Sequence, residues 1–540
     1  MNRQDAVAEA FDYVIVGAGS AGCVLANRLT ESGRYRVLLL EAGPGDGSLW
    51  HRLPLGYGRT LYDERYARHF LTEPEPHMDG RKLMWPRGRM LGGSSSVNGL
   101  IFIRGQARDY DHWASLGNPG WGWADVLPYF RKLEHNSRGA SALHGGDGPL
   151  WCSDIRDRYP FFEALFDAAG EQGIPRNGDF NGPEQEGAGY YQFFVRNGFR
   201  CSTAVAYLRP AMKRPGLRVL TEAMSTRVLT ENGRATGIEY RHGGRTHVAT
   251  ARREVILAAG SLQSPQLLML SGIGPRAHLE SVGVAPVHDL PGVGENLQDH
   301  LNVRSVYRLS QRVTLNDSLG SLAGRIGLAA RYVLGRRGPL SHSAAPAGIF
   351  ARVLPESEGP DVQFHLLALS TRGALNQPHD FPGCTFSVCQ LRPESRGRIT
   401  LRSTDAAEAP VIQANYLATE HDRRCLLAGI KLSRRIALSP ALGAFVESEM
   451  LPGAQAQSDD DLMAFARDNG ATIYHPTGTC KMGDDAMAVV DSRLRVHGLA
   501  SLRVVDCSVM PTLVSGNTNA PTVMIAEKAS DMILDDARVS

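Results

Sequence analysis

The stretch Tyr13-Val-Ile-Val-Gly-Ala-Gly-Ser-Ala-Gly22 has the form of a short apolar strand followed by a glycine-rich turn. The apolar run predicts a buried parallel strand, and a helix is predicted from Ala21 to about Glu31. A second apolar run over residues 36–40 predicts another strand, which ends at Glu41. A strand, a helix and a parallel strand in this order imply an α/β fold, in which helices cover both faces of a sheet.

The glycine-rich turn predicts a dinucleotide-binding site. The glycines of a Gly-x-Gly-x-x-Gly turn allow a tight bend, close approach of a pyrophosphate and close packing of helix on strand. The helix N-terminus then offers N–H groups to the phosphates. Glu41 lies 19 residues after Gly22, where a carboxylate holds the adenosine ribose and disfavours a 2′-phosphate. The residues assigned to this site are Gly17, Gly19, Ser20, Ala21, Gly22, Glu41 and Ala42.

Two ligands and one structural alternative remain at this stage. FAD or NAD is expected rather than NADP, because of the carboxylate at Glu41. The alternative is a turn that serves only packing, with Glu41 as a surface acid.

Composition and charge exclude several classes of protein. The chain has 540 residues, of which 43% are hydrophobic and 21% charged, an ordinary globular balance. With 58 basic against 56 acidic residues and no long run of like charge, a basic face for nucleic acid is not expected. No cluster of His, Asp and Glu has metal-ligand spacing, and no Gly-x-Ser-x-Gly elbow indicates a hydrolase.

The cysteines and the apolar runs indicate the kind of compartment. No two of the eight cysteines form a Cys-x-x-Cys pair, so we expect free, buried thiols in a reducing environment. Residues 1–10 do not resemble a secretory signal, and no apolar run approaches the roughly 20 residues that span a bilayer. We therefore expect a cytoplasmic protein without a transmembrane segment, with peripheral contact to the inner membrane left open.

A second run of small residues, Gly88-Arg-Met-Leu-Gly-Gly-Ser-Ser-Ser-Val-Asn98, lets the backbone lie flat against a large planar ligand. This stretch resembles the first signature of the glucose–methanol–choline (GMC) family of FAD-dependent oxidoreductases. Three further stretches are similar to family motifs, residues 260–274, 291–300 and 474–483. The resemblance runs from Phe11 to about Ile533. Residues 179–182 and 185–189 resemble the bacterial choline, alkanol, polyethylene-glycol and sorbose dehydrogenase branch.

The resemblance implies which residues bind FAD and how it is attached. Some choline-oxidising members link FAD covalently to a histidine just before the asparagine of the first signature. This chain has Val97 there, so we expect FAD to be bound non-covalently. Asp506 resembles the family's flavin-adjacent aspartate, with a surface acid at a strand end as the alternative, and Val228 is placed beside the adenine. The other residues assigned to FAD are Arg89, Gly92, Ser94, Asn98, Gly99, Asn519 and Pro521.

The resemblance also implies two interleaved domains, and the fold is then α/β in one part and α+β overall. A Rossmann-like FAD-binding domain is expected beside a substrate domain built on an antiparallel sheet with helices. Cys384–Cys389 and Arg398–Arg402 fit half-buried antiparallel strands. The FAD-binding domain is assigned residues 1–155, 215–310 and 470–540, and the substrate domain residues 155–215 and 310–470.

His475 is the first catalytic candidate. Oxidation of an alcohol removes the hydroxyl proton and a hydride from the same carbon, and a histidine can take the proton because its pKa lies near ambient pH. His475 lies in the glycine-rich stretch Tyr474–Gly483 and matches the family's active-site histidine. The alternative is a structural histidine, a role that fits His300 and His342 better.

Asn519 is the second catalytic candidate. It precedes a predicted amphipathic helix over residues 523–534, with Pro521 in the first turn. An asparagine there can serve as a helix N-cap, and the positive end of the helix can face the flavin. In the family this position is histidine or asparagine and bonds the substrate oxygen. Asn517 is the alternative if the loop alignment slips by two residues.

The function expected from these residues is oxidation of a primary alcohol, polyol or sugar to the carbonyl. His475 accepts the proton, hydride passes to flavin N5, and electrons continue to a quinone or another acceptor that is not oxygen. Two alternatives remain open, an oxidase that uses O2 and releases H2O2, and a flavin-binding lyase of the same fold. The sequence fixes neither the alcohol nor the oligomeric state.

Overall fold

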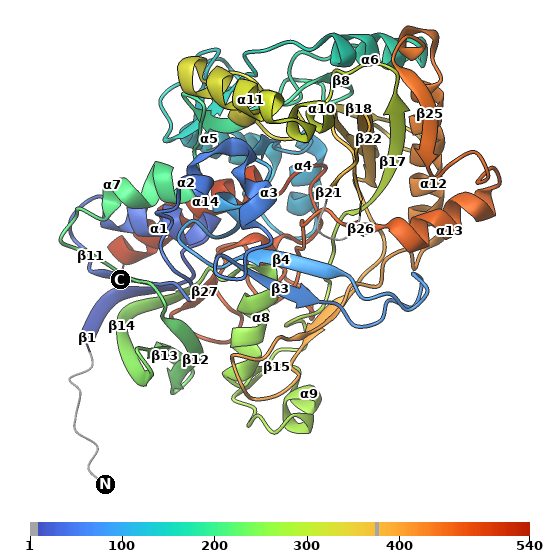
Figure 1. Ribbon diagram of the computed structural model, residues 1–540. Helices are drawn as coiled ribbons and strands as arrows, with labels where there is room; N and C mark the ends of the chain where they lie inside the picture. The colour runs from blue at the N-terminus through green and yellow to red at the C-terminus, as the bar shows by residue number, and fades with distance from the viewer. Residues whose placement is uncertain (1–8, 373–376, 540) are drawn as a thin grey trace.

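Two large sheets organise the computed structural model, which describes residues 9–372 and 377–539 (Figure 1). The first sheet has the strand order β11-β2-β1-β14-β13-β12, and β27 also pairs with β14. Strands β11, β2, β1, β14 and β27 are joined in parallel, whereas β12 and β13 extend β14 in antiparallel fashion. The strands are β1 (Glu9–Val16), β2 (Val37–Leu40), β11 (Leu217–Leu220), β12 (Met224–Glu231), β13 (Arg234–His242), β14 (Arg245–Leu257) and β27 (Leu502–Val504).

The strand–helix–strand unit predicted from the glycine-rich stretch is confirmed. All of β2 is buried, as expected for a parallel strand with both faces covered. Helix α1 (Ser20–Thr30) connects β1 to β2, and α14 (Asn519–Val539) packs beside α1. An ion pair of 2.7 Å between Arg28 and Glu527 joins these two helices. Both helices begin at the ends of the parallel strands, so their positive N-terminal ends can face one ligand.

The second sheet is antiparallel throughout, as the resemblance implied. Its order is β25-β17-β22-β19-β18-β8, with β26 also paired to β17. Strand β22 is buried along its whole length, so the expectation that it is half-buried is wrong. Helix α12 (Glu420–Ala437) covers it, and Gly429 allows the close approach, since a Cβ there would lie 2.8 Å from Val388. The strands are β8 (Gly187–Tyr190), β17 (Leu301–Leu309), β18 (Ala347–Ala351), β19 (Val362–Leu367), β22 (Gly383–Gln390), β25 (Val446–Leu451) and β26 (Ala471–Thr472).

A five-stranded sheet and short elements surround the two large sheets. The strands of this third sheet are β5 (Ile101–Phe102), β6 (Glu134–Asn136), β7 (Leu150–Ser153), β9 (Gln192–Arg196) and β10 (Phe199–Arg200). The other strands are β3 (Ala67–Leu71), β4 (Met84–Gly88), β15 (Ile273–Gly274), β16 (His288–Asp289), β20 (Thr371–Arg372), β21 (Gln377–Pro378), β23 (Arg398–Thr400) and β24 (Val411–Gln413). The other helices are α2 (Leu49–Arg52), α3 (Tyr57–Thr60), α4 (Ala107–Ser115), α5 (Trp123–Leu133), α6 (Pro160–Glu171), α7 (Arg209–Ala211), α8 (Gly260–Leu270), α9 (Arg276–Ser281), α10 (Leu315–Gly320), α11 (Leu322–Gly335) and α13 (Asp459–Asn469).

The chain passes several times between the two large sheets. Strand β17 lies inside the antiparallel sheet although it precedes residue 310, where the substrate domain is predicted to resume. Strand β26 joins the same sheet just after residue 470, where the FAD-binding domain is predicted to resume. The division into domains stays a prediction. The five-stranded sheet also crosses a predicted boundary, because β7, before residue 155, pairs with β9, after it.

Three further features concern the cysteines, the length and apolar character of the helices, and the grouping of possible metal ligands. All eight cysteines are free and buried, as predicted. Within residues 9–372 and 377–539, no helix combines the length and apolar character needed to cross a bilayer. In the same residues, His, Cys, Asp and Glu form no group of three or more that could hold a metal ion.

Candidate active site

A cavity of about 1100 Å³ is lined by residues of both large sheets. The end of β1 and the start of α1 contribute Val16, Gly19 and Ser20, and the second sheet contributes Arg304 and Ser387. Pockets for drug-sized ligands are typically about 300–1,000 Å³. The cavity is therefore large enough for a dinucleotide together with a small substrate.

The glycine-rich turn forms one end of this cavity. Gly17 has a φ of +97°, which favours glycine, and Gly17 and Gly19 line the cavity. Gly22 does not belong to the lining; a Cβ at Gly22 would lie 1.8 Å from the carbonyl oxygen of Gly17. Gly22 therefore serves the packing of α1 on the turn, whereas Gly17 and Gly19 leave space for a ligand.

Glu41 is a buried acid of the cavity rather than a surface acid. Its Oε2 accepts a hydrogen bond from Ala18 N at 2.9 Å, and its Oε1 accepts one from Gly43 N at 2.8 Å. Burial raises the pKa of Glu41 to about 7, against the effect of these backbone donors. Glu41, with Ala42 beside it in the lining, is held where a ribose hydroxyl could reach it.

The first signature contributes a second wall. The residues predicted from it that line the cavity are Arg89, Ser94, Asn98 and Gly99. Gly92 lies behind this wall with a φ of +86°, and a Cβ there would lie 2.2 Å from Ser96 Oγ. Val97 is buried against Leu61 and Met90 and also lines the cavity. An alkyl side chain at this position has no atom that could form a covalent link to a flavin.

Asp506 lies in the cavity wall at the end of β27. Its Oδ2 accepts hydrogen bonds from Gly260 N at 2.8 Å and Ser264 Oγ at 2.6 Å, and its Oδ1 accepts one from Ser508 N at 2.8 Å. The carboxylate thus caps the start of α8 and is buried, so the surface-acid alternative is wrong.

Two assignments to FAD are not supported by the geometry. Val228 lies outside the cavity lining, and its N–H donates to Ser271 Oγ at 2.8 Å. Ala223, Met224 and Ser225 line the cavity instead, because β12 enters the cavity at its first residues. Pro521 lies in the first turn of α14 and is also absent from the lining.

The surroundings of His475 determine which of its nitrogens carries the proton. Burial, and after it the electrostatic effects of His300, His365 and Arg87, lower the pKa of His475 well below the ordinary value. His300 is also neutral near pH 7, because burial lowers its pKa to about 4. His300 Nε2 lies 3.0 Å from the carbonyl oxygen of Leu391, which can only accept, so this nitrogen carries the His300 proton.

The contact between His300 and His475 then determines where His475 carries its proton. His300 Nδ1 is left as an acceptor and lies 3.0 Å from His475 Nδ1, so His475 donates from Nδ1. Nε2 of His475 therefore bears a lone pair. Asn517 Nδ2 lies 3.2 Å from this nitrogen and donates to it. The site thus holds a neutral histidine with its basic nitrogen next to an amide donor, and both residues line the cavity.

The predicted pairing of His475 with Asn519 is corrected by this geometry. Asn519 is the first residue of α14, and its Oδ1 accepts a hydrogen bond from Ser20 Oγ at 2.7 Å. The start of the helix thus directs this side chain to the start of α1, on the dinucleotide side of the cavity. Asn517, in the loop before the helix, is the asparagine that meets His475.

The backbone at His475 is held in an unusual conformation. Tyr474 has a φ of +71°, which is rare for a residue with a side chain. Its N–H donates to Thr472 Oγ1 at 2.8 Å, and its carbonyl accepts from Arg87 Nη1 at 2.8 Å. His475 N donates to Asp299 Oδ1 at 2.8 Å. These bonds fix the direction of the histidine, and such strain is typical of functional sites.

The sequence analysis missed Asp299 and Gln363 and named His300 only as a structural histidine. His300 and Asp299 lie in the stretch 291–300, whose similarity to a family motif was a usable signal. Gln363 had no such signal; its Nε2 donates to Asn517 Oδ1 at 3.2 Å and so turns the amide donor of Asn517 toward His475. It comes from β19, and only the folded sheet brings it there.

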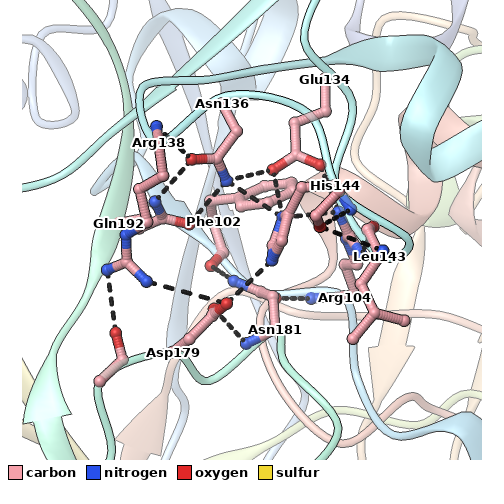
Figure 2. A network of polar contacts seen from close by, with 12 residues as sticks. Phe102, Arg104, Glu134, Asn136, Arg138, Leu143, His144, Asp179, Asn181 and Gln192 are labelled. Atoms are coloured by element: carbon pink, nitrogen blue, oxygen red, sulfur yellow. Dashed lines mark hydrogen bonds and ion pairs between the residues drawn. The ribbon is translucent and has the colours of Figure 1, made fainter.

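A polar cluster of mostly buried side chains surrounds Arg104, in the segment before α4 (Figure 2). Arg104 pairs with Glu134, and His144 bridges Glu134 at 2.9 Å and Asp179 at 2.8 Å. Asp109 lies five residues after Arg104, and its Oδ2 accepts a hydrogen bond from Ser515 N at 2.7 Å. We call Arg104, Glu134, His144 and Asp179 the Arg104 cluster. Its charges satisfy one another, so it supports the site rather than forming one.

Comparison with known proteins agrees with this geometry. Residues 11–302 and 393–526 match the two models of the GMC oxidoreductase family. The chain is 44% identical over 528 residues to an alcohol dehydrogenase [acceptor] of Pseudomonas putida, covering 97% of this chain and 96% of that one. It is 44% identical over 535 residues to an oxygen-dependent choline dehydrogenase of Photobacterium profundum, covering 98% and 94%.

Solved structures share the fold over nearly the whole chain. Pyridoxine 4-oxidase from Mesorbium loti aligns with a TM-score of 0.88 at 30% identity, over 96% of this chain and 98% of that one. A mutant formate oxidase from Aspergillus oryzae, studied for FAD modification, aligns with a TM-score of 0.92 at 27% identity, over 98% and 99%. The chain therefore belongs to the GMC oxidoreductase family, and it is an enzyme that acts on CH–OH groups with FAD as its cofactor.

Proposed function

We propose that this enzyme oxidises an alcohol to the carbonyl and that Nε2 of His475 takes the hydroxyl proton. The carrying observation is the hydrogen-bond chain from Leu391 through His300 to His475, which leaves Nε2 unprotonated in a residue that lines the cavity. FAD supplies the hydride acceptor, at flavin N5. A base with a lowered pKa stays neutral in mildly acidic solution and is ready to accept a proton.

Asn517 holds the substrate oxygen in this proposal. An amide nitrogen has two N–H donors, and one of them already points to His475 Nε2. When a substrate binds, its hydroxyl can take the place of this contact, donate to His475 Nε2 and accept from Asn517. The negative charge that grows on this oxygen is then stabilised by a fixed donor, whose orientation Gln363 maintains.

The residues that hold FAD are proposed from the cavity wall. Gly17, Gly19, Ser20 and Ala21 present the start of α1 to the pyrophosphate, and Glu41 receives the ribose. Asn519, at the start of α14, faces the same ligand. The first-signature residues in this set are Arg89, Ser94, Asn98 and Gly99, and Asp506 completes it.

The cavity wall formed by the antiparallel sheet suits an uncharged primary alcohol or polyol better than it suits choline. Arg304 pairs in register with Ser387, which pairs with His365, so the three form one row across β17, β22 and β19. All three line the cavity, and the described strands of this sheet add no Asp or Glu to the lining. Neighbouring strands are about 4.8 Å apart, and Arg304 and His365 are two strands apart in this row. The cationic end of a substrate that lies against the row would therefore be near the Arg304 guanidinium.

A matched pair of alcohols tests this preference. Tyrosine rings attract ammonium groups, and Tyr57, Tyr62 and Tyr474 also line the cavity, so charge must be compared at constant shape. Choline and the dimethylbutanol in which carbon replaces the nitrogen form such a pair. We expect the neutral alcohol to reduce the flavin at least about 10-fold more efficiently, since like charges in one cavity repel appreciably at an effective dielectric constant of about 20. Equal or better flavin reduction by choline contradicts the preference. Arg304→Gln should make the difference in reduction efficiency between the two alcohols smaller.

The electron acceptor is proposed to be a quinone or another acceptor that is not oxygen. The relatives carry names of both kinds, alcohol dehydrogenase [acceptor] and oxygen-dependent choline dehydrogenase. Hydrogen peroxide formed in equal amount to the alcohol consumed would instead identify an oxidase.

Anaerobic addition of alcohols tests the reaction itself. The panel is ethanol, hexanol, benzyl alcohol, sorbose, sorbitol and choline, mixed with the holoenzyme without oxygen. Bleaching of the flavin absorbance by at least one of them is expected, because oxidation transfers two electrons to the cofactor. A lyase transfers none, so an unbleached flavin together with cleavage of a cyanohydrin would contradict the proposed reaction.

A further inference from the structure

Helix α11 lies almost wholly in solvent although it is rich in large apolar residues. Of its 14 residues, only Leu328 and Tyr332 are buried. Leu322 is 75% exposed, Ile326 60%, Val333 66% and Leu334 87%. Figure 1 shows α11 at the outer edge of the molecule, at the top of the view. Large apolar side chains gathered in this way mark a contact surface rather than ordinary surface variation.

The apolar residues share one face of the helix. Leu322, Ile326 and Val333 recur at intervals of four and seven residues, the spacing of a helical stripe. The buried pair lies on another stripe and holds α11 to the body, where Tyr332 Oη donates to the carbonyl of Gly198 at 2.9 Å. The core therefore uses one side of α11 and leaves the apolar side outward.

The charge around this face is positive. Between Asp317 and Glu356 the sequence has no acidic residue. Helix α11 and the turn after it carry Arg325, Arg331, Arg336 and Arg337, and Arg331 forms an ion pair with Asp157 at 3.6 Å. A helix with an apolar face and basic flanks suits the interface of a bilayer with anionic headgroups. Charge complementarity thus selects an anionic lipid surface over a neutral protein partner.

The same region borders the cavity. Helix α10 packs against α11 and directly precedes it, and Leu315 and Leu319 of α10 line the cavity. We propose that α11 docks this enzyme onto an anionic bilayer, with α10 carrying the contact toward the cavity. If the proposed function holds, an apolar alcohol or a quinone could then pass from lipid to the site; the docking itself does not depend on that function.

Vesicle co-sedimentation of the holoenzyme tests the docking. The vesicles are phosphatidylcholine alone, or equal parts of phosphatidylcholine and phosphatidylglycerol. Wild type should bind the anionic vesicles and bind less as salt is added, since exposed charges are screened. The double variant Leu322→Ser/Ile326→Ser should bind at least 10-fold more weakly, because the apolar contribution to interfacial binding is lost.

A matched variant controls for the loss of an exposed leucine. Leu438, at the end of α12, is 80% exposed, and Leu438→Ser should bind vesicles like wild type. FAD absorbance of each variant verifies that it is folded, and no alcohol is present in the assay. Wild type that stays in the supernatant with anionic vesicles overturns the proposal. So does a double variant that binds as wild type, or one that only changes a dimer of this chain into monomers.

Discussion

At the scale of single residues, the site depends on a histidine that is buried and neutral. A base of ordinary pKa would lose activity as the pH falls toward 6.5. His475 has a pKa held well below that value, by burial and by nearby positive groups, so it keeps its lone pair in mild acid. The rate of proton removal should therefore stay near its plateau at pH 6.

Replacing Asn517, in the loop before α14, and replacing Asn519, the first residue of α14, should have different effects. Asn517→Ala removes the donor beside His475 Nε2 and should slow anaerobic flavin reduction roughly 10²-fold, as expected for loss of one oxyanion donor. Asn519→Ala removes the bond to Ser20 and should mainly weaken FAD retention. Stopped-flow reduction and FAD content after gel filtration measure the two effects. The reverse pattern would restore Asn519 as the partner of His475.

At the scale of elements, sequence reasoning predicted the features that a local pattern of residues determines. The β1–α1–β2 unit and Glu41 were predictable because glycine positions and apolar runs determine that turn directly. The asparagine beside His475 was not, because it depends on where α14 begins, and a shift of two residues exchanges Asn517 for Asn519. Gln363 and Arg304 were also out of reach, since their places depend on strand register across β17, β22 and β19.

The Arg104 cluster should make stability depend on pH. Burial alone would lower the pKa of His144, but its bonds to Asp179 and Glu134 outweigh this and raise it to about 9. A raised pKa contributes stability that is complete below the unfolded value, about 6.5, and is lost as the pH rises through 9. The pKa values of Glu134 and Asp179 are lowered by His144 against burial, so their contribution is lost in acid instead.

His144→Gln tests this dependence, because glutamine carries no charge at any pH. The melting temperature of wild type, scanned at one fixed rate, should fall between pH 6.5 and 9, by an amount equivalent to about 1–3 kcal/mol. The variant should melt lower than wild type at pH 6.5 and show little further change up to pH 9. Parallel curves for the two proteins would show that His144 is not charged in the fold.

At the scale of the whole molecule, the cavity that is proposed to hold FAD is lined by residues of both large sheets. A cavity of about 1100 Å³ joins residues from β1, α14 and β17, so a ligand in it contacts distant parts of the chain. A ligand that binds only the folded state stabilises it by mass action. Added FAD should raise the melting temperature of the apoprotein in a concentration-dependent way, and NAD at the same concentrations should not. Equal stabilisation by NAD would contradict the assignment of the glycine-rich site to FAD.

The position of α11 is the other feature that only the whole molecule reveals. The fold shows that the apolar side of α11 faces outward while α10 reaches the cavity. An enzyme with this arrangement would take substrate from, or deliver electrons to, a lipid phase without a helix that spans it.

The most direct test of the account is the rate of anaerobic flavin reduction in His475→Ala. With the best alcohol of the panel, reduction should slow by roughly 10²–10⁴-fold relative to wild type. FAD content should stay near wild type, because His475 meets the substrate side of the cavity rather than the glycine-rich turn. If His475→Ala reduces its flavin at the wild-type rate from about pH 6 to 9, the base is a different residue and the proposed role of His475 is wrong.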